Sequence, residues 1–153
     1  MRVSIIAVGR VRDTHLAAAI REYEGRSAHY WNLDVAEVRE EPARGQAPAI
    51  VKEREGERLL ARAGSALVVA CDPNGEGLSS EKFSTWLSER RDAAQDVAFV
   101  IGGAFGLSAA VLQRATRKLL LAPFTLPHEL ARLVLAEQLY RAGTLMRGEP
   151  YHK

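Results

Sequence analysis

Hydrophobic residues along the chain fall into short apolar runs that alternate with segments of helical spacing. Runs that end in glycine, proline or aspartate predict five β-strands. We expect these strands at residues 2–8, 33–40, 65–72, 96–103 and 118–124. Three of them are nearly continuous apolar runs, which is typical of strands buried on both faces of a parallel sheet.

Between the runs, apolar residues at helical spacing predict helices. Side chains suited to capping the first turn stand at Asp13, at Ser79 or Ser80, and at Ser108. A charged helix over about residues 49–63 is expected to turn Ile50, Leu59 and Leu60 inward. The longest helix should run from about 128 to 146, and Pro73 to Gly75 should form a turn. The alternation predicts an α/β fold, a mostly parallel sheet with helices on both faces.

The composition indicates how many domains the chain forms and in which compartment it is expected. The chain of 153 residues is expected to form a single domain, residues 1–153, large enough to bury a core without disulfides or metals. A single cysteine, Cys71, fits a reducing compartment. With no membrane-spanning run and no signal-peptide pattern, we expect a cytoplasmic protein.

The charge becomes informative when the chain is divided. Residues 104–153 hold seven Lys or Arg against three acidic residues, whereas residues 1–103 hold 14 basic and 16 acidic residues. Basic charge in the C-terminal third suits an anionic partner such as RNA, although chance accounts for so small an excess equally well.

Candidate chemistry lies at the carboxyl ends of three predicted strands, where parallel sheets bind ligands. The stretch "VIGGAFGLS" places Gly102, Gly103 and Gly106 after one of them. The pattern follows a late strand and lacks the spacing of a dinucleotide fingerprint, and no Gly-Lys-Ser/Thr follows it. Two interpretations stay open: a tight turn into a helix, or bare backbone that a ligand approaches.

Other candidates have ordinary explanations beside the functional ones. Cys71 at the end of an apolar strand is typical of a buried small hydrophobe, and the four histidines show no metal-ligand spacing, so no metal site is predicted. Glu137 and Arg141 have the spacing of a helical salt bridge. The terminal "RGEPYHK" is expected to fray, or to dock only when a ligand is present.

The order of these segments is more specific than any one of them. "VSIIAVGR", "VIGGAFGLS", "LLLAPFTLPHELARLVLAEQLYRA" and the terminal "RGEPYHK" together closely resemble the RlmH family. Members of that family are ribosomal large-subunit pseudouridine N3-methyltransferases of the SPOUT superfamily. The resemblance covers essentially the whole chain and is most specific in its last fifty residues.

The resemblance implies a C-terminal trefoil knot, a homodimer, and S-adenosylmethionine held by main-chain groups. It implies 23S rRNA on the ribosome as the partner. Carried over by position, the expected cofactor contacts are Cys71, Gly102, Gly103, Leu121, Ala122, Pro123, Phe124, Thr125 and Leu126. The expected catalytic residues are His152, Tyr151 and Arg141, and the expected RNA contacts are Arg132, Arg147 and Lys153.

Within that resemblance, His152 would accept the N3 proton directly or through water, and Tyr151 would stack on or hydrogen-bond the base. Phe105 would alter packing near the cofactor if its ring pointed into the groove. The tail is expected to be mobile or to rest loosely over the groove. The alternative function is a catalytically silent RNA-binding or ribosome-binding module of the same fold.

Overall fold

The computed structural model describes residues 1–152, without the side chain of His152. Its elements follow in the order β1 (Arg2–Val8), α1 (Thr14–Ser27), β2 (Asn32–Val38), α2 (Pro48–Ala63), β3 (Leu67–Gly77), α3 (Ser80–Asp92), β4 (Val97–Ile101), α4 (Ala109–Arg114), β5 (Arg117–Leu120), α5 (His128–Met146) and the 3-10 turn η1 (Pro150–His152).

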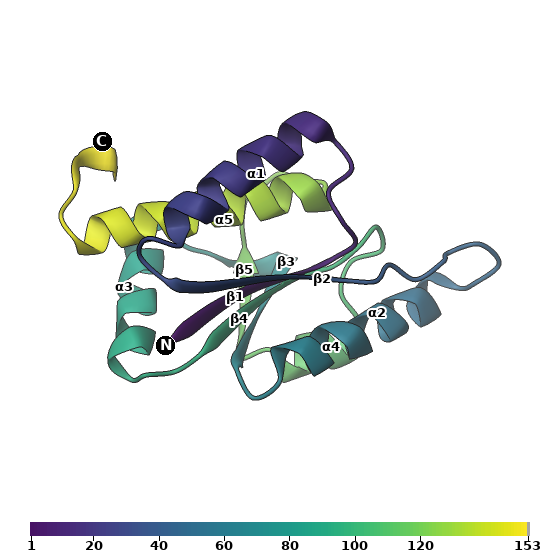
Figure 1. Cartoon of the computed structure of the whole chain (residues 1–153). Coiled ribbons are helices and arrows are strands. Elements are labelled where there is room, and N and C mark those ends of the chain that lie inside the picture. Colours follow the sequence, from purple (N-terminus) through teal and green to yellow (C-terminus); the bar gives the residue numbers. More distant parts are fainter. Residues whose placement is uncertain (153) are drawn as a thin grey trace.

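The five strands form one sheet in the order β2-β1-β4-β3-β5, and every neighbouring pair is parallel. Helices α1, α3 and α5 cover one face of the sheet, and α2 and α4 cover the other (Figure 1). The predicted fold class is therefore confirmed. All five strands point their carboxyl ends to the same edge, which we call the carboxyl edge.

Alternation along the strands divides the core into two layers. Val3, Ile5 and Phe99 face α1, α3 and α5, whereas Ile6 and Val100 face α2 and α4. Neighbouring strand residues thus support opposite layers, as expected for a sheet covered on both faces. Within residues 1–152, no helix combines the length and apolarity needed to cross a membrane.

The predicted helix starts are confirmed at three caps. Asp13 Oδ1 accepts a hydrogen bond from the Leu16 amide at 2.8 Å. Ser79, rather than Ser80, caps α3 through the Lys82 amide, and Ser108 caps α4 through the Val111 amide. These side chains satisfy amides that have no partner within the helix.

One predicted helix orientation is wrong in detail. Leu59 of α2 is buried as expected, but Ile50 is 43% exposed and Val51 takes the inward position instead. The helix begins at Pro48, so Ile50 lies in its first turn at the periphery of the α2–α4 layer.

Two predicted strand ends also differ. β5 stops at Leu120, so residues 121–126 are irregular backbone rather than strand. β3 continues through the predicted turn to Gly77, because Cys71 and Glu76 both pair with Leu119 and residues 72–75 bulge out between them. Asp72 Oδ1 accepts the Asn74 amide at 2.8 Å. The residues predicted to turn the chain therefore form a hydrogen-bonded turn inside the bulge of β3.

Candidate functional site

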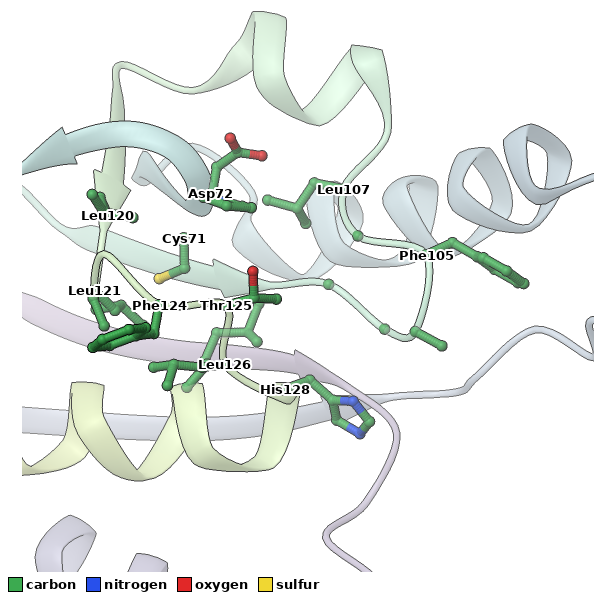
Figure 2. A pocket seen from close by; sticks show the side chains of 18 residues that line it. Cys71, Asp72, Phe105, Leu107, Leu120, Leu121, Phe124, Thr125, Leu126 and His128 are labelled. Carbon is green, nitrogen blue, oxygen red and sulfur yellow. The ribbon is translucent and has the colours of Figure 1, made fainter.

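A cavity of about 320 Å³ opens at the carboxyl edge between β3, β4 and β5. Its walls come from the end of β3, the loop that follows β4, the irregular segment after β5, and the first turn of α5 (Figure 2). This volume lies at the lower end of the range of small-molecule sites. The three strand ends singled out in the sequence therefore meet at one pocket.

Eight of the nine expected cofactor contacts line this pocket. They are Cys71, Gly102, Gly103, Leu121, Ala122, Phe124, Thr125 and Leu126. Pro123 belongs to the same segment but is not part of the lining. Because residues 121–126 make no strand pairing, their carbonyls, and their amides except at Pro123, are available to a ligand.

Cys71 contributes an unreactive thiol to the pocket. Burial raises the pKa of Cys71 to about 12, and the neighbouring Asp72 carboxylate adds to the effect. A thiol with such a pKa stays protonated at neutral pH and is a poor nucleophile. This supports the interpretation of Cys71 as an apolar contact.

The glycine loop of residues 102–106 folds back on itself. The Gly106 amide donates to the Gly103 carbonyl at 3.0 Å, and Gly106 has a φ of +83°. A Cβ on Gly102 would lie 2.6 Å from the Gly106 carbonyl carbon. Gly102 is therefore required by the loop itself, which supports the tight-turn interpretation at this position.

The expectation for Gly103 needs correction. A Cβ there would not project toward a ligand but would lie 3.0 Å from Glu55 Oε2 and 3.1 Å from Val8 Cγ1. Gly103 lines the pocket through its backbone, and its bare side faces the protein interior. The ring of Phe105 also points away from the pocket rather than into it (Figure 2).

Behind the glycine loop lies Glu55 of α2, a buried carboxylate with 3% exposure. Its Oε1 accepts the Glu41 amide at 3.1 Å, whereas Oε2 has no hydrogen-bond partner among the described residues. Burial raises the pKa of Glu55, and the Glu40 charge raises it further. The next residue, Gly56, packs so closely on Ser108 that a Cβ would lie 2.3 Å from its Oγ. α2 therefore supports both ends of the loop.

Several lining residues were not among the expected cofactor contacts, including Asp72, which was expected at one of the three strand ends, Leu107 and His128. Asp72 directly follows Cys71, and His128 begins α5 just after the 121–126 segment, so adjacency was the available signal. Within the described part of the chain, Asp72 is the one acidic residue of the lining and no Lys or Arg belongs to it. The pocket therefore suits a ligand with a positive charge.

The structure brings Tyr151 and Arg141 together, but not at the pocket lining. Tyr151 packs on Tyr140 with ring centroids 4.5 Å apart and donates to Glu137 Oε1 at 3.1 Å. Arg141 pairs with Glu137 at 2.6 Å, as the spacing predicts, and lies 4.9 Å from the Tyr151 ring centroid. Burial, with a hydrogen bond to Tyr23, raises the pKa of Tyr151. The tail up to Tyr151 therefore rests on α5, not over the groove as expected.

Arg132 is wrongly placed among the expected RNA contacts. Only 7% of it is exposed, and its guanidinium pairs with Glu24 at 2.8 Å and Glu37 at 2.7 Å. Burial alone would lower the pKa of Arg132, but these two carboxylates raise it. The residue ties α5 to α1 and β2, and its donors are turned away from solvent.

The remaining expected site residues are the RNA contacts Arg147 and Lys153 and the catalytic residue His152. Arg147 is exposed, with its guanidinium 4.5 Å from the Tyr30 ring centroid and a hydrogen bond to the His29 carbonyl. The side chain of His152 and the whole of Lys153 lie outside the described residues.

Fold and pocket together define an α/β protein with a pocket at the carboxyl ends of a parallel sheet. The chain belongs to the SPOUT methyltransferase family, since the family model described as "Predicted SPOUT methyltransferase" matches residues 1–152.

Full-length relatives agree with this assignment. Ribosomal RNA large subunit methyltransferase H of Gemmatimonas aurantiaca is 62% identical, and the protein of that name from Carboxydothermus hydrogenoformans is 44% identical. In both alignments, 100% of this chain and 100% of the relative are covered.

Solved structures share the fold at low sequence identity. A probable methylase family protein from Haemophilus influenzae is 11% identical with a TM-score of 0.60, covering 99% of this chain and 70% of that one. The SpoU methyltransferase AviRb of Streptomyces viridochromogenes, solved in complex with the cofactor AdoMet, is 17% identical with a TM-score of 0.50. That match covers 97% of this chain and 59% of AviRb.

Proposed function

We propose that this protein methylates N3 of a pseudouridine in 23S rRNA, with S-adenosylmethionine as methyl donor, and that it acts on the ribosome in the cytoplasm. The observation that carries the proposal is the pocket at three strand ends, in a chain whose full-length relatives are named for methylation of large-subunit rRNA. We also propose that residues 1–153 form one domain and that its C-terminal part forms the trefoil knot that the family resemblance implies.

The residues that line the pocket suit this cofactor in polarity and in charge. Apolar side chains such as Leu107 and Leu126 suit the adenine, and unpaired backbone in residues 121–126 can satisfy its polar edge. The single acidic lining residue, Asp72, favours a cationic sulfonium. In this arrangement Pro123 shapes the segment rather than touching the cofactor.

The bound cofactor supplies an activated methyl group, so the protein's task is alignment and removal of the N3 proton. The glycine loop and residues 121–126 hold the donor in one orientation. Arg141 and Tyr151 contact the base, and the His152 imidazole accepts its proton, directly or through water. Because neither Tyr151 nor Arg141 lies in the pocket lining of its own chain, these roles require that substrate RNA, bound to the proposed dimer, bring the target base into contact with both residues and with a pocket.

The chain acts as a homodimer through α5 in this proposal. Leu130, Leu133 and Val134 lie on one face of α5 and are each only partly buried. Near the start of the same helix, Phe124 is 81% exposed. α1, α3 and η1 cover the rest of α5 within one chain, so the interface we propose is confined to this part of the helix.

A methyl-transfer assay tests the function directly. The full chain is incubated with methyl-labelled S-adenosylmethionine and with free 23S rRNA, isolated large subunits, or whole ribosomes. We expect label at N3 of one pseudouridine, with the highest rate on the assembled particle. Absence of label from all three substrates would contradict the proposal.

Two controls separate the alternatives. Calorimetry with S-adenosylmethionine distinguishes the enzyme from a silent RNA-binding module, which should bind no cofactor. Light scattering at micromolar concentration tests the dimer, and Leu133→Glu, with a charge at the proposed interface, should give a monomer while Arg91→Glu should not. A wild-type monomer would remove the dimer from the proposal.

A further inference from the structure

The exposed ring of Phe105 occupies a distinctive place beside the pocket. Its backbone lines the cavity, but its side chain is 43% exposed and points away from the cavity (Figure 2). The turned glycine loop holds this orientation, because Gly106 donates to Gly103 across it. An exposed phenylalanine has unfavourable hydration, which a stacking partner would relieve.

The strand order fixes what lies next to this loop along the carboxyl edge. β4 is followed by β1 and then by β2, with Ala7 paired to Ile101 at the end of the β1–β4 ladder. The Gly9 amide donates to the Val38 carbonyl at 2.8 Å, which continues the β1–β2 pairing one residue past the end of β1, to the last residue of β2. Arg10 and Arg39 therefore follow the glycine loop along this edge, across about 10 Å.

These two arginines and Arg44, in the loop after β2, are exposed. Among residues 1–152, none of the three guanidinium groups has a recorded ion pair or hydrogen bond. Arg39 uses its carbonyl to accept Arg58, but its side chain is unengaged. We call Phe105, Arg10, Arg39 and Arg44 the arginine edge.

Acidic residues in the same two loops already have hydrogen-bond or ion-pair partners. Asp13 caps α1, and Glu40 pairs with Arg12 at 2.9 Å. Glu41 is buried between Arg54, at 2.9 Å, and Arg58. The two arginines hold the pKa of Glu41 down at about 2 through their hydrogen bonds, so it stays ionised and paired. The positive charge of the arginine edge is left for an external anion.

We propose that the arginine edge is an RNA-contact surface, in which Phe105 stacks on a nucleobase next to the modified one and the three arginines bind backbone phosphates. An aromatic platform flanked by guanidinium groups is the usual means of holding an unpaired strand. The surface adjoins the pocket through the glycine loop, so a strand bound there would pass the pocket mouth. This inference rests on the proposed function, because that function makes ribosomal RNA the partner of this surface.

The test measures binding to isolated large ribosomal subunits by co-sedimentation, in parallel with methyl transfer. Phe105→Ala should weaken subunit binding about tenfold, whereas Phe105→Trp should bind like the wild type. The triple variant R10A/R39A/R44A should bind more weakly and lower the slope of log affinity against log salt by about 2 to 3. S-adenosylmethionine affinity should stay unchanged in the triple arginine variant, because none of its three residues lines the pocket.

Matched controls are available on the same chain. Ile50→Ala removes an equally exposed apolar side chain, also 43% exposed, from α2. Arg91→Ala removes an exposed arginine at the end of α3, near the opposite edge of the sheet. Both should bind subunits like the wild type.

Wild-type binding by Phe105→Ala, or an unchanged salt slope in the triple variant, would overturn the inference. A change of oligomeric state in Phe105→Ala would overturn it as well, since a second copy would then cover the ring. If the proposed function were wrong, the wild type would bind subunits without transferring methyl groups. The co-sedimentation measurement would still test whether the arginine edge contacts RNA.

Discussion

Glu55 Oε2 lies 3.0 Å from the position that a Cβ on Gly103 would occupy, and this contact joins α2 to the wall of the pocket. The carboxylate oxygen is buried and has no hydrogen-bond partner among the described residues. The glycine loop is therefore positioned from behind by a titratable group that touches no ligand.

The first prediction concerns Gly103→Ala. The added methyl group presses on Glu55 and Val8, so the variant should lose about 1–2 kcal/mol of stability in urea unfolding and bind S-adenosylmethionine more weakly. Glu55→Ala in the same chain removes one of the two contacts, so the double variant should be more stable than the sum of the single effects predicts. Gly25→Ala, in a helix with open space around it, is the control and should be neutral or stabilising. Strict additivity at Gly103 and Glu55 would contradict the contact.

A second prediction follows from the raised pKa of Glu55. Its folded-state pKa exceeds the ordinary value of 4.5, so the folded protein holds the proton more tightly and stability falls as pH rises from about 4.5 through the folded pKa. Glu55→Gln cannot ionise, and its stability relative to the wild type should increase over that interval. Urea unfolding of both proteins from pH 4 to 8 measures the difference. Parallel curves would show that Glu55 titrates normally.

Arg132 supplies the third prediction. Arg132→Ala leaves Glu24, whose side chain is 12% exposed, without its cation, whereas the exposed Glu37 stays in contact with water, so stability should fall by about 1.5–3 kcal/mol. The exposed Arg147→Ala is the control and should change stability by about 0.5 kcal/mol or less. Thermal unfolding checks both. If Arg132→Ala were fully stable but defective in subunit binding, the original interpretation of Arg132 as an RNA contact would be restored.

The fourth prediction concerns the tail. Deletion of residues 149–153 removes the packing of Tyr151 on Tyr140 and the hydrogen bond from Tyr30 to Glu149. We expect a loss of about 1–2 kcal/mol, which lowers the melting temperature by several degrees. Methyl transfer should fall steeply while cofactor affinity changes little. Tyr151→Phe, which keeps the ring, isolates the hydroxyl and should retain most of the stability.

Much of the fold was predictable because apolar runs and caps are local signals. The boundaries of β1 and α5 match their expected residues, and Asp13 and Ser108 cap the helices assigned to them. The strand ends near the pocket were less predictable. The bulge in β3 depends on pairing with Leu119, nearly fifty residues away, and nothing in the letters Asp-Pro-Asn-Gly distinguishes it from a turn.

The position of the pocket was predictable because glycine and proline cluster at the strand ends. The directions of the side chains around it were not predictable. The bare side of Gly103 faces the protein interior rather than a ligand, and the ring of Phe105, whose direction the sequence left open, faces away from the pocket, since a loop's orientation depends on contacts with α2. Arg132 was misjudged because an arginine in a basic segment does not reveal its carboxylate partners on α1 and β2.

The position of β1 in the middle of the sheet has a consequence for how the chain folds. β1 pairs with β2 soon after both are synthesised, but its other partner, β4, begins 94 positions later at the Val3–Val97 pair. Closing so long a loop before its contacts are gained slows folding. One side of β1 therefore stays unpaired until more than half of the chain has emerged, and we expect folding on the ribosome to be completed only when β4 arrives.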